Sequence, residues 1–182
     1  EIARTLAPMV DSLIISGRRE EPLRDLEKEL IGVVDVKVVI ADLSTESGVD
    51  FLIEEAGDLD ILVNNAGYGL YGRVADQDPD KLLGIVDVNI RALTKLGHHH
   101  STSMRMRGKG KILNVASIAA FQPGPGMAVY CASKAYVLSL SRAMSAELKG
   151  SGVTVTALCP GYVETGFQST SGMKLTLSLI HI

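Results

Sequence analysis

Short apolar runs alternate with helical patterns along this chain, and that alternation limits the fold more than any other feature. Apolar runs rich in β-branched residues lie at 12–16, 36–40, 61–65, 111–117 and 153–158. Helical patterns lie between them, at 21–31, 78–107 and 128–149. Such runs are typical of strands covered on both faces, and strand–helix–strand units favour a parallel sheet. The sequence therefore predicts an α/β fold, a doubly wound parallel sheet with helices on both faces.

The composition fits a single soluble domain and argues against several classes of partner. The 182 residues are 46% hydrophobic and 21% charged, with a net charge of −3. This balance supplies enough apolar mass for a core and no basic footprint for nucleic acid. No apolar run reaches the roughly 18 residues of a membrane span. Cys131 and Cys159 lack CxxC spacing, so neither a disulfide framework nor a zinc site is expected, which suits the cytoplasm.

The stretch "YCASK" places a phenol and an amine four positions apart, at Tyr130 and Lys134. On a helix these positions share one face, about 6 Å apart along the axis. An ammonium ~6 Å away, at an effective dielectric of about 20, favours the phenolate by roughly 3 kcal/mol, or about two pKa units. A tyrosine tuned in this way can exchange protons with a carbonyl or an alcohol. The same spacing alone also fits an ordinary surface pair.

Other polar residues stand where the predicted elements end. Ser117 closes the fourth apolar run, and catalytic groups of parallel sheets gather at the carboxyl ends of strands. A turn or N-cap serine is the alternative reading. Asn89 interrupts a long helical pattern, an unfavourable place for asparagine unless its side chain is bonded. "NNAG" (64–67) ends in a glycine that lets backbone approach a ligand, and "CPGYVET" (159–165) supplies a turn that can cradle a cofactor.

Taken in order, these motifs resemble the short-chain dehydrogenase/reductase family in its classical form. The resemblance runs from Glu1 to about Met173. It implies a Rossmann-like fold in which Tyr130 is the acid/base and Ser117 orients the substrate. It further implies that Lys134 lowers the pKa of the tyrosine and bonds the nicotinamide ribose, while Asn89 holds a water in a proton relay. The implied catalytic set is Asn89, Ser117, Tyr130 and Lys134.

The same resemblance implies a cofactor site and an activity. Asp42 and Leu43 would flank the adenine, and Asn65, Ala66 and Gly67 would line the adenosine ribose. The nicotinamide end would be held by Tyr130, Lys134, Pro160, Gly161, Val163 and Thr165. The implied reaction transfers hydride between NADP(H) and a small carbonyl or secondary alcohol substrate. Members of the family usually pair through two long helices, here at 78–107 and 128–149, so the resemblance also implies a homodimer or homotetramer of the parent protein.

The residues after the first apolar run indicate which nicotinamide cofactor is used. The run leads into Gly17, Arg18 and Arg19, with no carboxylate before Glu20. A carboxylate at this point bonds the ribose 2′-hydroxyl of NAD, whereas an arginine suits the 2′-phosphate of NADP. We therefore predict NADP rather than NAD, with Arg18 as the main phosphate contact and Arg19 beside it. A solvated basic pair capping a loop is the alternative.

Both ends of the chain depart from the family pattern. "EIARTLA" (1–7) resembles the helix that follows the family's glycine-rich loop, so a first strand and that loop are expected before Glu1. Without them, two strands face a gap and the pyrophosphate site is incomplete, so the 182-residue chain is expected to bind NADP poorly. "LSLIHI" (177–182) equals the translation of a DNA stretch that resembles a transposon-end adaptor, and a genuine apolar C-terminus is the alternative. We predict a partial domain over 1–176 and a non-native tail over 177–182.

Two other functions are compatible with parts of this motif set. A non-catalytic dinucleotide-binding regulatory module has no use for a tuned phenol, so the complete set of Asn89, Ser117, Tyr130 and Lys134 disfavours it. A nucleotide-sugar epimerase also uses YxxxK, but "NNAG" and the arginine pair disfavour that alternative. The three consecutive histidines at 98–100 diverge by about 100° per residue on a helix, so no metal site is expected there.

Overall fold

A computed structural model describes residues 1–161, and these form strands and helices in the predicted alternation. The strands are β1 (Ser12–Gly17), β2 (Asp35–Ile40), β3 (Ile61–Asn64), β4 (Gly110–Val115) and β5 (Val153–Leu158). The α-helices are α1 (Ile2–Leu6), α2 (Glu20–Leu30), α3 (Glu46–Ala56), α4 (Pro79–Val86), α5 (Leu93–Arg107) and α6 (Ala128–Glu147). Short 3-10 turns are η1 (Ala7–Met9), η2 (Val74–Asp76) and η4 (Ile118–Phe121).

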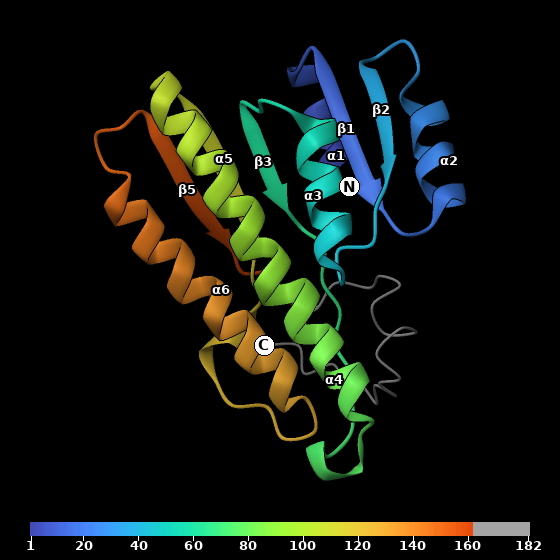
Figure 1. Cartoon of the computed structure of the whole chain (residues 1–182), viewed down its shortest axis with the longest axis vertical. Coiled ribbons are helices and arrows are strands. Elements are labelled where there is room, and N and C mark those ends of the chain that lie inside the picture. Colours follow the sequence, from blue (N-terminus) through green and yellow to red (C-terminus); the bar gives the residue numbers. More distant parts are fainter. Residues whose placement is uncertain (162–182) are drawn as a thin grey trace, which may run out of the picture.

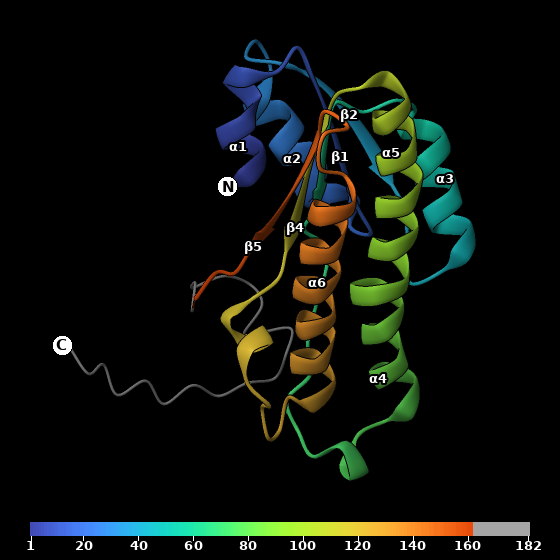
Figure 2. The same ribbon diagram turned by 90° about the vertical axis from the view of Figure 1, so that its left-hand side faces the viewer.

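Every strand pairing in residues 1–161 is parallel, as predicted. β1 pairs with β2, while β4 lies between β3 and β5. No pairing joins β1 to β3 within the described residues, so the strands form two sheets side by side, with the gap expected from the sequence (Figure 1). Figure 2 shows α3, α5 and α6 on one face of the strands and α1 and α2 on the other. The doubly wound arrangement is therefore confirmed.

The predicted helix at 78–107 contains an interruption at its centre. It begins as expected, since Asp78 caps it by accepting a hydrogen bond from the Asp80 amide at 3.0 Å. Between α4 and α5, however, the backbone forms a π-helical segment, η3 (Asp87–Ala92), that carries Asn89. Such segments widen a helix locally and are frequent at functional sites. The unfavourable asparagine noted in the sequence thus marks a real irregularity of the backbone.

Helix α3 was not predicted from the sequence. Its first turn contains Ser47 and Gly48, which weaken a helical pattern. The Thr45 side chain caps the helix by accepting a hydrogen bond from the Gly48 amide at 3.0 Å. A Cβ at Gly48 would lie 2.1 Å from the Asp42 carbonyl oxygen, so only glycine lets the helix start this close to the loop after β2.

The core lies between the strands and the helices that cover them. One buried cluster joins α3 and α5 to the sheet of β3, β4 and β5, and includes Val49, Leu96, Met104 and Ile112. A second cluster, built around Leu93, Ala116 and Val137, packs α6 against α5 and the end of β4. The two clusters together hold β3, β4 and β5 against α5 and α6. Within the described residues, no helix is both long and apolar enough to cross a membrane.

Candidate active site

Helix α6 places Tyr130 and Lys134 on one face, as the sequence predicts. The Lys134 ammonium nitrogen Nζ lies 5.9 Å from the centroid of the Tyr130 ring. It donates a hydrogen bond to the Val115 carbonyl oxygen, at 2.7 Å, where β4 ends. The side chain is buried, and burial lowers the pKa of Lys134 to about 8. The amine is thus held between the helix and the sheet and still carries its proton at neutral pH.

Ser117 lies beside Tyr130, two residues beyond the end of β4. The predicted strand at 111–117 is therefore too long at its end, and Ser117 instead caps η4 by accepting a hydrogen bond from the Ala119 amide at 3.1 Å. The N-cap alternative is therefore confirmed, and the Ser117 side chain also lies close enough to Tyr130 to lower the pKa of its phenol. Burial raises the pKa of Tyr130, and the Ser117 bond opposes that rise. Burial has the larger effect, so the pKa of Tyr130 lies above its ordinary value, whereas the charge of Lys134 alone predicts a lower one.

Asn89 is fully buried and uses its whole amide group to join three parts of the chain. Its Nδ2 donates to the Ser133 hydroxyl oxygen at 2.9 Å and to the Tyr68 carbonyl oxygen at 3.0 Å, and its Oδ1 accepts from the Tyr68 amide at 3.1 Å. Both amide hydrogens are therefore engaged by protein. Asn89 holds the loop after β3 against α6.

The loop after β3 passes close to the catalytic candidates at Gly67. A Cβ at this position would lie 3.0 Å from Asn89 Oδ1 and 3.4 Å from Lys134 Nζ. The backbone at Gly67 therefore lies close to both of these side chains, and the approach to a ligand expected from "NNAG" stays a prediction. Asn65, Ala66 and Gly67 are all exposed beside this point.

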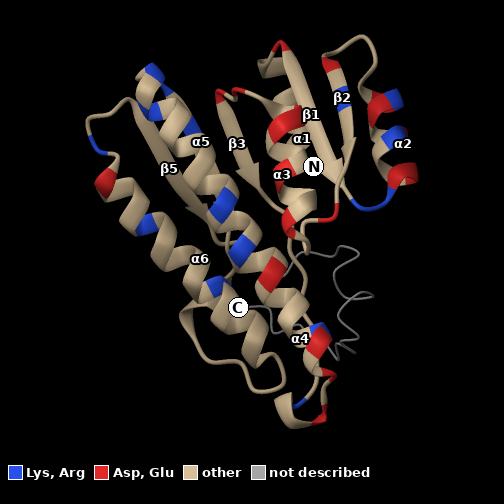
Figure 3. Ribbon diagram, in the orientation of Figure 1, with Lys and Arg blue, Asp and Glu red and all other residues tan. Residues whose placement is uncertain are grey.

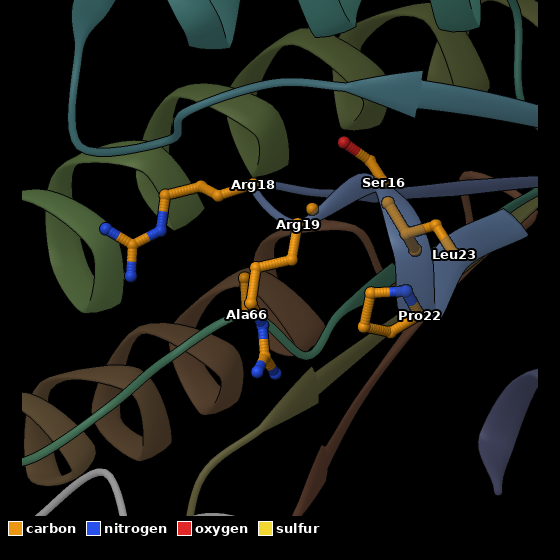
Figure 4. A pocket seen from close by; sticks show the side chains of 7 residues that line it. Ser16, Arg18, Arg19, Pro22, Leu23 and Ala66 are labelled. Atoms are coloured by element: carbon orange, nitrogen blue, oxygen red, sulfur yellow. The ribbon is translucent and has the colours of Figure 1, made fainter.

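A pocket of about 520 Å³ lies between the ends of β1 and β3 (Figure 4). It brings together Arg18, Arg19 and Ala66, which were predicted as cofactor contacts from separate segments. The two guanidinium groups point to different sides. The Ser16 hydroxyl oxygen, at the same place, is buried and has no hydrogen-bond partner within residues 1–161. The pocket is thus cationic at its rim, while the buried Ser16 hydroxyl points away from Arg19 and Ala66 (Figure 4).

The remaining predicted cofactor residues have local partners or lie elsewhere. Asp42 accepts hydrogen bonds from the Ser44 amide and hydroxyl, which hold the pKa of its carboxyl below the usual value. Leu43 packs against the core cluster of α3 and α5. The Pro160 carbonyl accepts from the Ile118 amide at 3.1 Å, so Pro160 and Gly161 pass next to Ser117. Val163, Thr165 and the predicted tail 177–182 lie outside the described residues.

The surface beside Ser117 is apolar and uncharged. Ile118 and Phe121 of η4 are exposed, and so is Tyr71 on the loop after β3. The Gly72 amide donates to the Gly126 carbonyl at 2.8 Å, and this hydrogen bond joins the loop after β3 to the loop between η4 and α6. No charged residue occurs between Lys111 and Lys134 in the sequence, and Figure 3 shows the loop that precedes α6 without charge.

Sequence reasoning missed Ser133, which is fully buried between Asn89 and Tyr130. It also missed the chain of Asn64, Asn114 and Ser141, in which Asn64 donates to Asn114 and Asn114 donates to Ser141, each at 2.9 Å. The available signal was the position of polar residues on otherwise buried faces of a strand or helix, since buried polar groups require partners.

The model of the family described as short chain dehydrogenase matches residues 1–175. The chain belongs to the short-chain dehydrogenase family. A 3-oxoacyl-(acyl-carrier-protein) reductase of Rickettsia prowazekii is 35% identical over 167 residues, which cover 90% of this chain and 67% of that protein. Sulfoacetaldehyde reductase 2 of Chromohalobacter salexigens is 37% identical over 171 residues, covering 91% of this chain and 68% of that protein.

Solved structures of short-chain dehydrogenases share the fold. A short-chain dehydrogenase from Sphingobium yanoikuyae in complex with NADPH matches with a TM-score of 0.91 and 30% identity, covering 98% of this chain and 72% of that one. A gluconate 5-dehydrogenase from Burkholderia cenocepacia in complex with NADP and tartrate matches with a TM-score of 0.78 and 28% identity, covering 93% and 68%. The named relatives above are oxidoreductases, and both of these structures contain a nicotinamide dinucleotide.

Proposed function

We propose that this protein is an NADP-dependent oxidoreductase that interconverts a carbonyl compound and a secondary alcohol, with Tyr130 as the acid/base. The observation that carries the proposal is the contact of Tyr130 with Ser117 on one side and its proximity to Lys134 on the other. A phenol placed between a hydroxyl and a buried amine is suited to proton exchange with a substrate oxygen.

The residues of the site fit a bound nicotinamide dinucleotide. The two arginines and Ala66 line a pocket at the ends of β1 and β3, and Gly67 leaves room for a ligand next to Lys134. Arg18 and Arg19 favour a 2′-phosphate, and hence NADP over NAD. We propose that Asp42, Leu43, Asn65 and Ala66 border the adenosine end, with Pro160, Gly161, Val163 and Thr165 at the nicotinamide end.

NADPH, when bound, supplies the hydride that adds to the carbonyl carbon. Tyr130 gives its phenolic proton to the carbonyl oxygen as the C–O double bond becomes single, and the Ser117 hydroxyl holds that oxygen in place. The Lys134 ammonium stabilises the phenolate left behind. In the reverse direction, the Tyr130 phenolate would remove the proton of the alcohol, with Ser117 holding the alcohol oxygen.

We further propose that the substrates are neutral and apolar carbonyl compounds. The segment from Ser117 to Tyr130 carries no charge, and the exposed side chains of Tyr71, Ile118 and Phe121 offer apolar contact. A charged substrate would lose hydration beside this surface without finding an opposite charge on it. Apolar groups attached to the carbonyl would instead be stabilised by burial against these side chains.

We also propose that the protein is cytoplasmic and that it forms a homodimer or homotetramer. The exposed face of α6 carries small side chains that permit close helix packing, at Ala132, Ala135, Ser139, Ala143 and Ala146. Light scattering on the complete protein tests the assembly. A monomer at micromolar concentration would contradict it.

Oxidation of NADPH by the complete protein, in the presence of a panel of neutral ketones and aldehydes, tests the function. We expect turnover with at least one apolar ketone and a lower rate with NADH. Tight binding of NADPH without turnover of any carbonyl would instead support a non-catalytic dinucleotide-binding regulatory module.

A further inference from the structure

The buried face of α6 carries two serines that make the same kind of contact, eight residues apart. The Ser133 hydroxyl accepts from Asn89 Nδ2 at 2.9 Å and donates to the Tyr130 carbonyl oxygen at 2.7 Å. The Ser141 hydroxyl accepts from Asn114 Nδ2 at 2.9 Å and donates to the Val137 carbonyl oxygen at 2.6 Å. Both serines are almost completely buried.

The two serine–asparagine hydrogen bonds differ in the other partners of the asparagine. Asn114 accepts from Asn64 across the register pair of β3 and β4, so the Ser141 contact ends within the sheet. Asn89 instead binds both backbone groups of Tyr68, next to the glycine that approaches Lys134 Nζ. The Ser133 contact therefore ends at the wall of the candidate active site.

We propose that Ser133 is a positioning residue for the reaction, fixing the turn of α6 that carries Tyr130 and Lys134 against Asn89 and the loop after β3. The inference rests on the proposed function. Its basis is a bonded path that is complete in the structure: Tyr130 carbonyl, Ser133 hydroxyl, Asn89 amide, and the backbone of Tyr68.

Loss of the Ser133 hydroxyl would leave one Asn89 hydrogen buried without an acceptor. Because an unsatisfied buried donor is costly, the Asn89 amide would turn to another acceptor and release Tyr68. The Tyr130 turn would also lose a hydrogen bond to its carbonyl, and the phenol would then be less firmly held against Ser117. Since the Ser117 bond lowers the pKa of Tyr130, that pKa would rise.

The test compares Ser133→Ala with the matched control Ser141→Ala in the complete protein. Both variants remove a buried hydroxyl bonded to an asparagine, so we expect similar losses of thermal stability. For alcohol oxidation, Ser133→Ala should lower kcat about tenfold and move the midpoint of the acid limb up by about half a pH unit or more. Its KM for NADP should stay within about twofold of the unchanged protein. Ser141→Ala should leave both kcat and the pH profile unchanged, within about twofold.

Ser133→Thr keeps a hydroxyl that can bond the same carbonyl, and we expect it to retain the original pH profile. Equal effects of Ser133→Ala and Ser141→Ala on kcat would overturn the proposal, as would a Ser133→Ala chain that fails to fold while Ser141→Ala folds. Amide exchange at Tyr68 separates this proposal from the function, because it should accelerate in Ser133→Ala and not in Ser141→Ala even if no carbonyl is turned over. Unchanged exchange at Tyr68 in Ser133→Ala would overturn the proposal by itself.

Discussion

Lys134 Nζ lies 5.9 Å from the centroid of the Tyr130 ring and is bonded to the Val115 carbonyl where β4 ends. The helical spacing of four residues thus sets the distance between Tyr130 and Lys134. The hydrogen bond to Val115 at the end of β4 fixes the orientation of the Lys134 side chain. Asn89 and Ser133 add a second connection between this turn of α6 and the loop after β3. The candidate acid/base is therefore held from two sides by buried polar contacts.

The buried ammonium of Lys134 is predicted to reduce the stability of the ligand-free chain. The pKa of this group falls from 10.5 when unfolded to about 8 when folded, so at neutral pH burial of the charge costs about 3 kcal/mol, offset by about 1 kcal/mol from the bond to Val115. Lys134→Met should therefore unfold at higher denaturant while losing activity. The sign is checked by pH: between about 8 and 10.5 the native state sheds the proton that the unfolded state keeps, so the unchanged protein regains stability relative to Lys134→Met. A variant that is less stable at pH 7 would contradict this prediction.

Arg18 is predicted to select NADP over NAD. Arg18→Ala should weaken NADPH binding by about tenfold to a hundredfold, the effect of one hydrogen bond to a charged group, and leave NADH binding almost unchanged. Arg24→Ala is the control, since this arginine lies on α2 and does not line the pocket. Calorimetry with the two cofactors measures the ratio. Equal losses for NADPH and NADH in Arg18→Ala would show that the arginine does not contact the phosphate.

Phe121 is predicted to contribute apolar contact to the substrate. Its side chain is 60% exposed on η4, next to Ser117. Phe121→Ala should raise KM for bulky apolar ketones by about tenfold, because roughly 1.5 kcal/mol of burial is lost, and should change KM for acetone little. Steady-state kinetics on the two ketones provides the comparison. An equal rise for acetone would indicate a general disturbance of the site instead.

His100 is predicted to make the fold sensitive to acid. The side chain is 1% exposed, neither ring nitrogen has a hydrogen-bond partner within residues 1–161, and burial lowers its pKa from 6.5 to about 4. As the pH falls from 6.5 to about 4, the unfolded state binds a proton at His100 that the native state does not bind. The free energy of unfolding should therefore fall by about 2–3 kcal/mol. Asp58, His99 and Arg107 are the charged or titratable neighbours that act on it.

His100→Leu should remove this loss between pH 6.5 and 4, and denaturant titrations at several pH values measure it. His98→Leu, at an exposed position on the same helix, should leave the slope unchanged. The pKa of Asp58 is lowered, so the stability that this carboxylate contributes is lost only as the pH approaches its ordinary pKa of 3.8 and falls below it. The effect of Asp58 is therefore confined to the acid end of the pH range. A slope that survives in His100→Leu would exclude the histidine as its cause.

Local spacing explains why much of the site was predictable. Tyr130 and Lys134 share a face because they are four residues apart on one helix, and the apolar runs form parallel strands as predicted. The expected cover on both faces is incomplete, since alternate residues of β5 and several residues of β2 are exposed. The oddity of Asn89 within a helical pattern was likewise visible, and it coincides with η3. Each of these signals is contained within a few neighbouring residues.

Contacts between distant segments explain what was missed. In "YCASK", Ser133 is one of the small residues between Tyr130 and Lys134, and nothing nearby in the sequence indicates a partner for its hydroxyl. Its partner Asn89 lies 44 residues away. The burial that raises the pKa of Tyr130 depends on packing from other elements, so a calculation from the Lys134 charge alone gave the opposite direction. Helix α3 escaped prediction because the glycine that weakens its pattern is required for its close approach to Asp42.

The turnover of Tyr130→Phe in the complete protein tests the central claim most directly. This substitution removes one hydroxyl and keeps the ring, so NADPH binding should remain within a few-fold of the unchanged protein. We expect kcat for ketone reduction to fall about a hundredfold to ten-thousandfold, the usual contribution of a general acid. A Tyr130→Phe protein that reduces ketones at the original rate would contradict the assignment of Tyr130 as the acid/base.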